Sequence, residues 1–341
     1  MIEQKEIDLN KPLDADKPAT LEKSTLTPAL TKASLILHGD YYKQSQSNLS
    51  KFVFWHPISI LVYTTLVPLV FGFVLWDYLS ISENLVEFYT IASKNRNDFI
   101  FNILRGAPIV ASIFASFAFI GYILGDDVGA IATNFISKNY CNSVYGFDVT
   151  EFVKEKSKAK VLKNGENTNI ISYRDQPIAI ITLVPDLKQS TPENFVVKIT
   201  GIHVRKVFQK VDFDNLLIEW AVVRSRELYQ EYLKDSKTNV KKGSILITAD
   251  CYSFNKKLAR ALQIHGFQIL DKSFELNPFE DTAKSYEKLI HKILGASLDT
   301  YGIILSTDEE DYELLKNSEL LEHNLSTSTS SSKEAIAKRR R

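Results

Sequence analysis

Two long apolar runs, separated by a short polar stretch, dominate the first third of the chain. They cover residues 52–79 and 99–124, and the first has no charged residue from 54 to 76. Those roughly 23 uncharged positions, at about 1.5 Å per residue in a helix, exceed the ~30 Å hydrocarbon core of a bilayer. Trp55 and Trp76 stand near the two ends, at the level where such rings meet headgroups. The pattern predicts two transmembrane helices.

The second apolar run is rich in small side chains. Ala111, Ser112, Ala115 and Ser116 recur along it at helical spacing. Small residues let helix backbones approach closely in lipid, where helices gain no hydrophobic attraction for one another. We therefore expect the two spans to pack as a tight hairpin around a loop at 80–98.

Strand and helix patterns alternate after residue 140. Two β-branched runs, 169–173 and 177–184, predict a hairpin; alternation at 195–204 predicts a third strand, and helical spacing a helix at 213–233. Strand, helix, strand, helix and strand are then expected at 244–249, 254–263, 267–274, 283–294 and 302–305. The predicted fold class is α+β, with a two-span hairpin followed by a mixed α/β domain at 125–318.

The two ends and the segment before the first span are expected to differ from this domain. Residues 1–31 are polar and predict a disordered tail, and 319–341 form a Ser/Thr-rich and basic tail without the means to pack. Residues 32–51, which lie between the N-terminal tail and the first span, contain a cluster of apolar and tyrosine residues. Such a segment could lie against the membrane surface or the C-terminal domain, and the simplest prediction is a short juxtamembrane helix that packs on the hairpin.

Charge and cysteine content exclude several function classes. The 41 basic and 41 acidic residues give a net charge of +0, which provides no electrostatic argument for nucleic acid. Cys141 and Cys251 are far apart, and the six histidines are not at ligand spacing. A disulfide framework and a cysteine-rich metal site are therefore not expected, and no metal is predicted.

Orientation across the membrane has to be argued from the larger segments. Basic residues beside the spans are almost balanced between the two sides, so the positive-inside rule does not decide. The C-terminal portion carries further lysines and ends in a basic tip, and its free cysteines suit a reducing compartment. We predict that both termini are cytosolic and that the loop at 80–98 is lumenal.

The order of elements from 169 to 305 resembles the Gcn5-related N-acetyltransferase fold. The match is specific at His265-Gly266-Phe267, where the family closes a helix on a Gly-Phe pair before the next strand. In that family a Gln/Arg-x-x-Gly-x-Gly/Ala loop holds the pyrophosphate of acetyl-CoA at a helix N-terminus. The resemblance places this loop at 209–214.

Here that loop departs from the family pattern. It starts with Gln209, but Asp212 and Asp214 occupy both glycine positions. Each side chain blocks the close backbone approach that glycine permits, and like charges at about 4 Å repel by about 4 kcal/mol at an effective dielectric of 20. Leu262 stands where the family has its tyrosine general acid. We therefore expect a degenerate cofactor loop, with the aspartates as helix N-caps, and no catalytic residue or cofactor.

A second resemblance covers more of the chain. It rests on the stretch 8–16, the segment 35–43, the Trp55-His56-Pro57 start of the first span and the two-span layout. Together they are similar to the yeast phosphate-regulon membrane proteins of the endoplasmic reticulum. This family implies a packaging chaperone needed for the high-affinity phosphate transporter to leave the endoplasmic reticulum.

That resemblance implies a set of partners. They are a polytopic phosphate transporter as client, the lipid bilayer and components of the vesicle coat. The client is expected to contact the small side chains Ala111, Ser112, Ala115 and Ser116 of the second span. Two other functions stay open: a membrane-anchored acyl-CoA-dependent N-acetyltransferase, which the two aspartates oppose, and a transporter, which two spans without a charged relay oppose.

Overall fold

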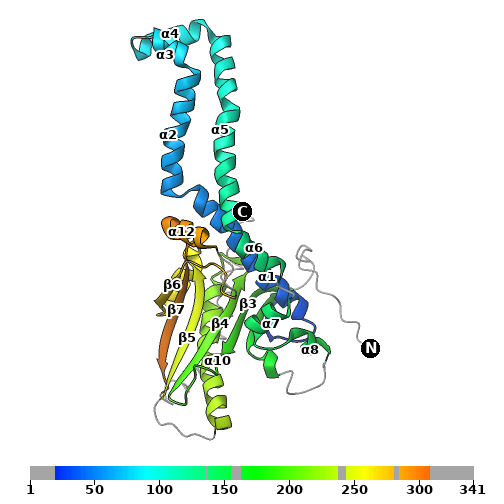
Figure 1. The fold of residues 1–341 in the computed structure, drawn as a ribbon. Helices are drawn as coiled ribbons and strands as arrows, with labels where there is room; N and C mark the ends of the chain where they lie inside the picture. The colour runs from blue at the N-terminus through cyan, green and yellow to red at the C-terminus, as the bar shows by residue number, and fades with distance from the viewer. Residues whose placement is uncertain (1–19, 135–136, 155–162, 237–242, 280–283, 308–341) are drawn as a thin grey trace.

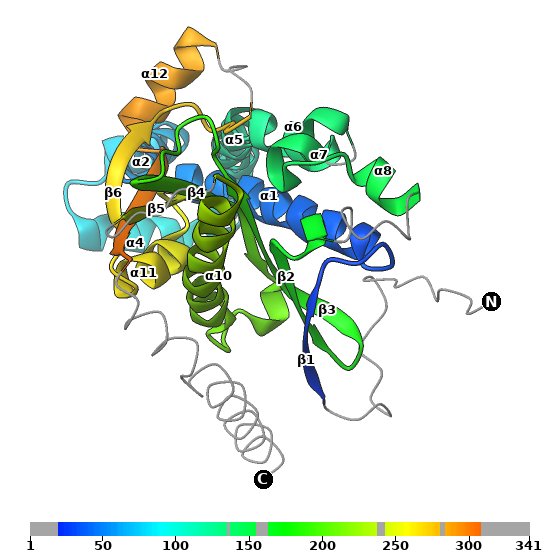
Figure 2. The ribbon, with the colours of Figure 1, turned by 90° about the horizontal axis from the view of Figure 1, so that it is seen from below.

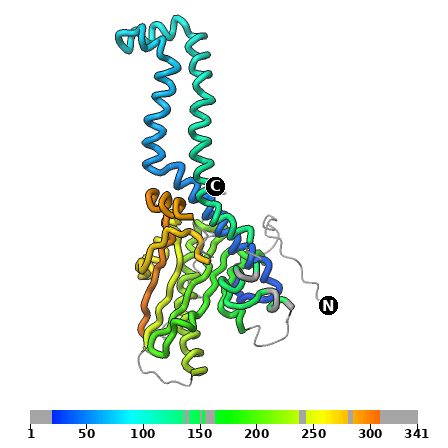
Figure 3. Tube along the Cα trace, in the orientation of Figure 1, coloured from blue at the N-terminus to red at the C-terminus, as the bar shows by residue number. Residues whose placement is uncertain are grey.

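The protein consists of a long helical hairpin that projects from one end of a domain built on a β-sheet (Figure 1). The structure is a computed structural model, and it describes residues 20–134, 137–154, 163–236, 243–279 and 284–307. The tube in Figure 3 follows the chain from the domain up through the hairpin and back into the domain. The predicted α+β class is confirmed.

The sheet has seven strands in the order β1-β2-β3-β4-β5-β7-β6. Only β4 and β5 pair in parallel among these neighbours. The predicted hairpin is present between β2 and β3, with Arg174 and Asp175 at φ 52° and 62° in its turn, the left-handed conformation that two-residue hairpin turns favour. The strands are β1 (Leu21–Thr25), β2 (Thr168–Tyr173), β3 (Gln176–Pro185), β4 (Asn194–Val204), β5 (Ser244–Tyr252), β6 (Gln268–Ser273) and β7 (Leu298–Ser306).

Helices cover both faces of the sheet (Figure 2). Successive strand residues point to opposite faces, and in β3 Ile181 joins the core under α10 (Phe213–Ser236) while Ile180 joins the core under α1 (Thr31–Phe54). The predicted Gly-Phe turn is also present, since Gly266 has φ 84° and the Phe267 N–H donates to Leu262 O at 3.0 Å. The remaining domain elements are α6 (Asp126–Thr133), α7 (Lys138–Tyr145), α8 (Val149–Lys154), η1 (Lys206–Phe208), α11 (Lys256–Ile264) and α12 (Ser285–Leu294).

The segment before the first span belongs to the domain, which corrects two predictions. The expected short juxtamembrane helix at 32–51 is part of the 24-residue α1, whose Leu37 and Leu49 are fully buried in the core. Residues 21–25, expected to be disordered, pair with β2 as β1. Both errors have one cause: the residues that these segments contact come far later in the sequence, beyond the first span, so the local pattern does not indicate the contacts. The tails 1–19 and 308–341 lie outside the described residues.

The apolar runs form helices with different bounds from those expected. The run 52–79 is divided among the end of α1, then α2 (Pro57–Val74) and α3 (Trp76–Ile81). The break follows from His56, whose ring Nδ1 accepts the Ile58 N–H and caps α2 ahead of Pro57. The second span is α5 (Arg96–Leu124), and the loop contains α4 (Leu85–Lys94). Helices α2 and α5 are both long and apolar enough to cross a membrane.

Candidate functional site

The hairpin is held together by aromatic side chains. The Tyr63 ring on α2 lies 4.8 Å from that of Phe114 and 4.9 Å from that of Phe117 on α5, centroid to centroid. Further toward the loop, Gly106 approaches the Phe71 ring. Edge and tilted ring pairs of this kind pack well without a polar contact. The two spans therefore touch along one face of α5.

The small side chains of α5 lie on the outer face, which corrects a prediction. Ala111, Ser112, Ala115 and Ser116 are exposed, and the α2 contacts are made by other residues. The Ser112 hydroxyl donates to Pro108 O at 2.8 Å, and the Ser116 hydroxyl donates to Ser112 O at 2.8 Å. The four residues form an uncovered surface, the small-residue stripe, whose serine protons are already used within the helix.

The tight helix contact that the sequence predicts exists elsewhere. Gly121, Gly125 and Gly129 face α1, and a Cβ on Gly121 would lie 3.1 Å from the Ser50 Cα. The Ser50 hydroxyl donates to Gly121 O at 3.1 Å. Glycines four residues apart are a known signal for close helix packing, so the spacing could have revealed this junction. It fixes the base of the hairpin to the helix that runs through the domain.

Helix α1 also fills the cleft between β4 and β5. These parallel strands pair only as far as Ile199 and Ala249, although both continue. Beyond that point Tyr41 of α1 stacks on the Tyr252 ring at 6.1 Å. Gln44, one turn later on α1, accepts a hydrogen bond from the Gln209 side chain at 3.1 Å. Helix α1 therefore lies across the opening between the two strands, and cavities of about 400 Å³ and 230 Å³ remain beside it.

The degenerate loop lies beside this filled cleft and does not fit a cofactor. Asp212 keeps a glycine-like φ of 44° immediately before α10. Of the two aspartates, either of which was expected as the cap, Asp212 directly precedes the helix, whereas Asp214 lies in the first turn and forms an ion pair with Lys257 at 2.5 Å. Lys257 also donates to the Gln209 carbonyl. Lys257 is thus paired, and a cavity of about 400 Å³, which Lys51 and Lys256 also line, remains among α1, this loop and the start of α11.

The groups that could act in acid–base or nucleophilic chemistry are buried and engaged. Leu262 is buried, and the Tyr252 hydroxyl donates to Leu276 O at 2.8 Å. Burial, together with the nearby Asp299 and Asp250 carboxylates, raises the pKa of Cys251 to about 12, so its thiolate is not populated near neutral pH. These residues serve the core.

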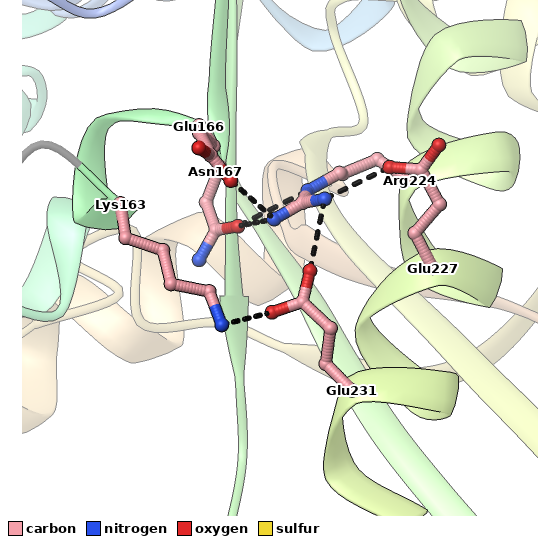
Figure 4. Close-up of polar contacts among 6 residues, drawn as sticks. All are labelled: Lys163, Glu166, Asn167, Arg224, Glu227 and Glu231. Atoms are coloured by element: carbon pink, nitrogen blue, oxygen red, sulfur yellow. Dashed lines mark hydrogen bonds and ion pairs between the residues drawn. The ribbon is translucent and has the colours of Figure 1, made fainter. Parts of the chain in front are cut away.

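A polar network holds α10 to the segment ahead of β2 (Figure 4). Arg224, only 8% exposed, donates to Asn167 Oδ1 at 3.0 Å from Nη2 and to Glu227 Oε2 at 2.8 Å from Nη1. Glu231 joins Arg224 at 3.2 Å and Lys163 at 2.9 Å. Every charge shown is paired, so this cluster is a brace between two elements.

Most of the chain matches a known protein family. Residues 3–305 match the family described as inorganic phosphate transporter chaperone Pho86. The chain belongs to this family. Membership in the Pho86 family confirms the function expected from the second resemblance, a chaperone for an inorganic phosphate transporter. No curated protein matches the chain.

Solved structures resemble part of this Pho86-family chain. A GNAT-family acetyltransferase from Streptococcus pneumoniae is 14% identical over 46% of this chain and 75% of that chain, with a TM-score of 0.28. Arabidopsis thaliana Naa50 in complex with a bisubstrate analogue is 14% identical over 50% and 92%, with a TM-score of 0.29. At these scores the likeness carries no argument about cofactor or activity.

Proposed function

We propose that the chain acts in the membrane of the endoplasmic reticulum and holds its phosphate-transporter client against the hairpin, so that the client can be packaged for export. The observation that carries this proposal is the small-residue stripe on α5. Ala111, Ser112, Ala115 and Ser116 face outward along a span whose opposite face is taken by α2. A transmembrane helix of the client can approach the backbone of α5 closely along this stripe.

The chemistry of the stripe suits a temporary complex. Helices in lipid associate through close packing and side-chain hydrogen bonds, which average only about 0.6 kcal/mol each. The Ser112 and Ser116 protons already bond within α5, so their oxygens can accept but have little left to donate. Association then depends mainly on packing, and a client so held can be released.

A pair of leucine substitutions tests this contact. Ala111→Leu with Ala115→Leu should push a client helix away, leaving the phosphate transporter in the endoplasmic reticulum and reducing phosphate uptake. Gly72→Leu on α2 is the matched control, because a Cβ there meets no atom within 4 Å and the stripe is unchanged. Normal transporter export in the double variant, at normal levels of this protein, would refute the contact.

The orientation of the chain across this membrane is proposed from its cysteines. Cys141 and Cys251 are both free thiols, which suits a domain in a reducing compartment. We therefore propose cytosolic termini and a lumenal α3–α4 loop.

A glycosylation acceptor tests this orientation. An insertion after Ser82, long enough to move the acceptor clear of the bilayer, should be glycosylated in the full chain. The natural sequons at Asn48 and Asn324 should remain unmodified. A glycan on either natural sequon, with an unmodified inserted loop, would reverse the orientation. The vesicle-coat partners stay a prediction that no contact in the structure addresses.

The non-enzymatic function rests on the filled cleft as well as on the family. An acyl-CoA-dependent transferase needs room for its cofactor where β4 and β5 separate, and there Tyr41 and Gln44 of α1 are seated. The nearby Asp214 carboxylate adds a charge of the wrong sign for a pyrophosphate. We propose that the sheet domain is a scaffold that retains an acetyltransferase-like architecture without its chemistry.

A further inference from the structure

Helix α12 presents an apolar face that nothing in the described part of the chain covers. Leu289 is 58% exposed and Ile293 59% exposed, and Tyr286 lies on the same side one turn earlier. The opposite side is buried through His291 and Leu294. Lysines follow one edge of the exposed face, at positions 284, 288 and 292. One side of α12 therefore packs into the core, and the other side exposes apolar side chains with lysines along its edge.

The position of α12 is fixed at the domain end of the hairpin. His291, 1% exposed, places its Nε2 3.2 Å from Leu124 O, at the last residue of the span α5. Its Nδ1 lies 3.2 Å from Phe274 O, so the ring joins α5 to the turn after β6. Figure 1 shows α12 at a level just below the start of α2, and Figure 2 shows that it extends to one side of the hairpin.

The depth of α12 can be read from the packing of the two spans. Phe71 lies against Gly106 and Tyr63 against Phe114 and Phe117, so the start of α2 is level with about Gly121 on antiparallel α5. Leu124 is three residues further, about 4.5 Å along the helix axis. The headgroup layer on each side of the hydrocarbon is roughly 5–7 Å thick. Helix α12 therefore meets α5 within the headgroup layer.

We propose that α12 lies in the membrane interface and binds the anionic lipid surface on the domain side. Leu289 and Ile293 would enter the boundary between headgroups and acyl chains, as the apolar faces of interfacial helices do. Lys284 and Lys292 would reach lipid phosphates or serine carboxylates, to which juxtamembrane basic residues are attracted. The exposed Trp55 ring at the start of α2 extends the same surface. This contact would hold the domain at a fixed tilt beneath the hairpin.

Depth-dependent quenching on the full chain tests the proposal. A fluorophore is attached through Leu289→Cys or Ile293→Cys, and the protein is reconstituted in phosphatidylcholine vesicles with or without phosphatidylserine. Both native cysteines are buried, which limits background labelling. Ile304→Cys is the control: this residue is 71% exposed, but it lies six residues along β7 from Leu298, about 20 Å further from α12.

Lipids with a quencher near the headgroup end of the acyl chain should quench the label at 289 or 293 at least threefold more than the label at 304. Aqueous iodide should give the opposite order. Lys284→Gln with Lys292→Gln should remove most of the difference between vesicles with and without phosphatidylserine. Equal iodide quenching at 289 and 304 would overturn the proposal. Protection from both quenchers at 289 would overturn it too, because a protein surface would then cover α12.

Discussion

The cleft between β4 and β5 and the outer face of α5 are opposite kinds of surface. In the cleft, Tyr41 and Gln44 of α1 contact Tyr252 of β5 and Gln209 of the loop after β4. The outer face of α5 carries small side chains, and the described chain leaves it open. The chain thus covers one of the two surfaces with its own helix and leaves the other, on a candidate membrane span, uncovered.

The largest effect is expected from a substitution in β4 that displaces α1 from the sheet. A Cβ on Gly201 of β4 would lie 2.3 Å from Cε1 of His38 in α1. Gly201→Val should therefore force α1 away from the sheet and lower the free energy of unfolding by about 3 kcal/mol, typical of an overpacked core. Thermal unfolding of the full chain in detergent, followed by tryptophan fluorescence, measures the loss. Gly72→Val, at an open position, should change stability by less than about 0.5 kcal/mol.

Acid should weaken the same contact through two buried histidines. Burial, with a smaller effect of the neighbouring charge, lowers the pKa of His38 and of His203 to about 3. Unfolded histidine takes up a proton below about pH 6.5, whereas these two stay neutral when folded, so the unfolded state holds more protons and stability falls as pH drops from 6.5 toward 3. Each contributes a loss of about 2 kcal/mol at pH 5.

Unfolding of the full chain at pH 7 and at pH 5 measures this slope. His203→Gln should retain a polar partner for Gln44, which His203 faces at 3.4 Å, and should make the pH dependence shallower by about 2 kcal/mol over that range. An unchanged slope would mean that His203 is protonated in the folded protein. Water would then reach His203 in the folded protein, although its side chain is buried.

The smallest effect expected concerns the cofactor loop. The full chain should give no heat of binding with acetyl-CoA in calorimetry. Asp212→Gly with Asp214→Gly removes the repulsion, yet Tyr41 and Gln44 still fill the cleft, so affinity should stay millimolar or weaker. Micromolar binding by the wild-type chain would show that the cleft opens, and the contrast with α5 would fail.

Local patterns were sufficient for most of the sheet domain and for both spans. The hairpin at Arg174-Asp175 and the Gly266-Phe267 turn were predictable because turn residues and the spacing of apolar positions depend only on residues close together in the sequence. The roles of β1 and α1 were not, because their partners lie beyond the hairpin in the sequence. Chain order suggested that the domain starts after the spans, whereas the fold uses segments from both sides of them.

The client contact on α5 stays a prediction, but the structure corrects the packing argument made for its small side chains. The small side chains on α5 were expected to pack against α2, but that contact uses Tyr63, Phe114 and Phe117. The sequence shows which residues share one face of a helix, but it does not show which of those faces the neighbouring helix contacts. The Gly121, Gly125 and Gly129 spacing was the stronger packing signal, and it serves the α1 junction.

Site-specific photocrosslinking in cells that express the phosphate transporter tests the central claim most directly. A photoreactive residue at position 115 of the full chain should form an adduct with the transporter. The same residue at 72, on the other span, or at 304, on the far part of the sheet, should give at least several-fold less. Adducts from 304 that match or exceed those from 115 would contradict the account and place the client on the sheet domain instead of the membrane hairpin.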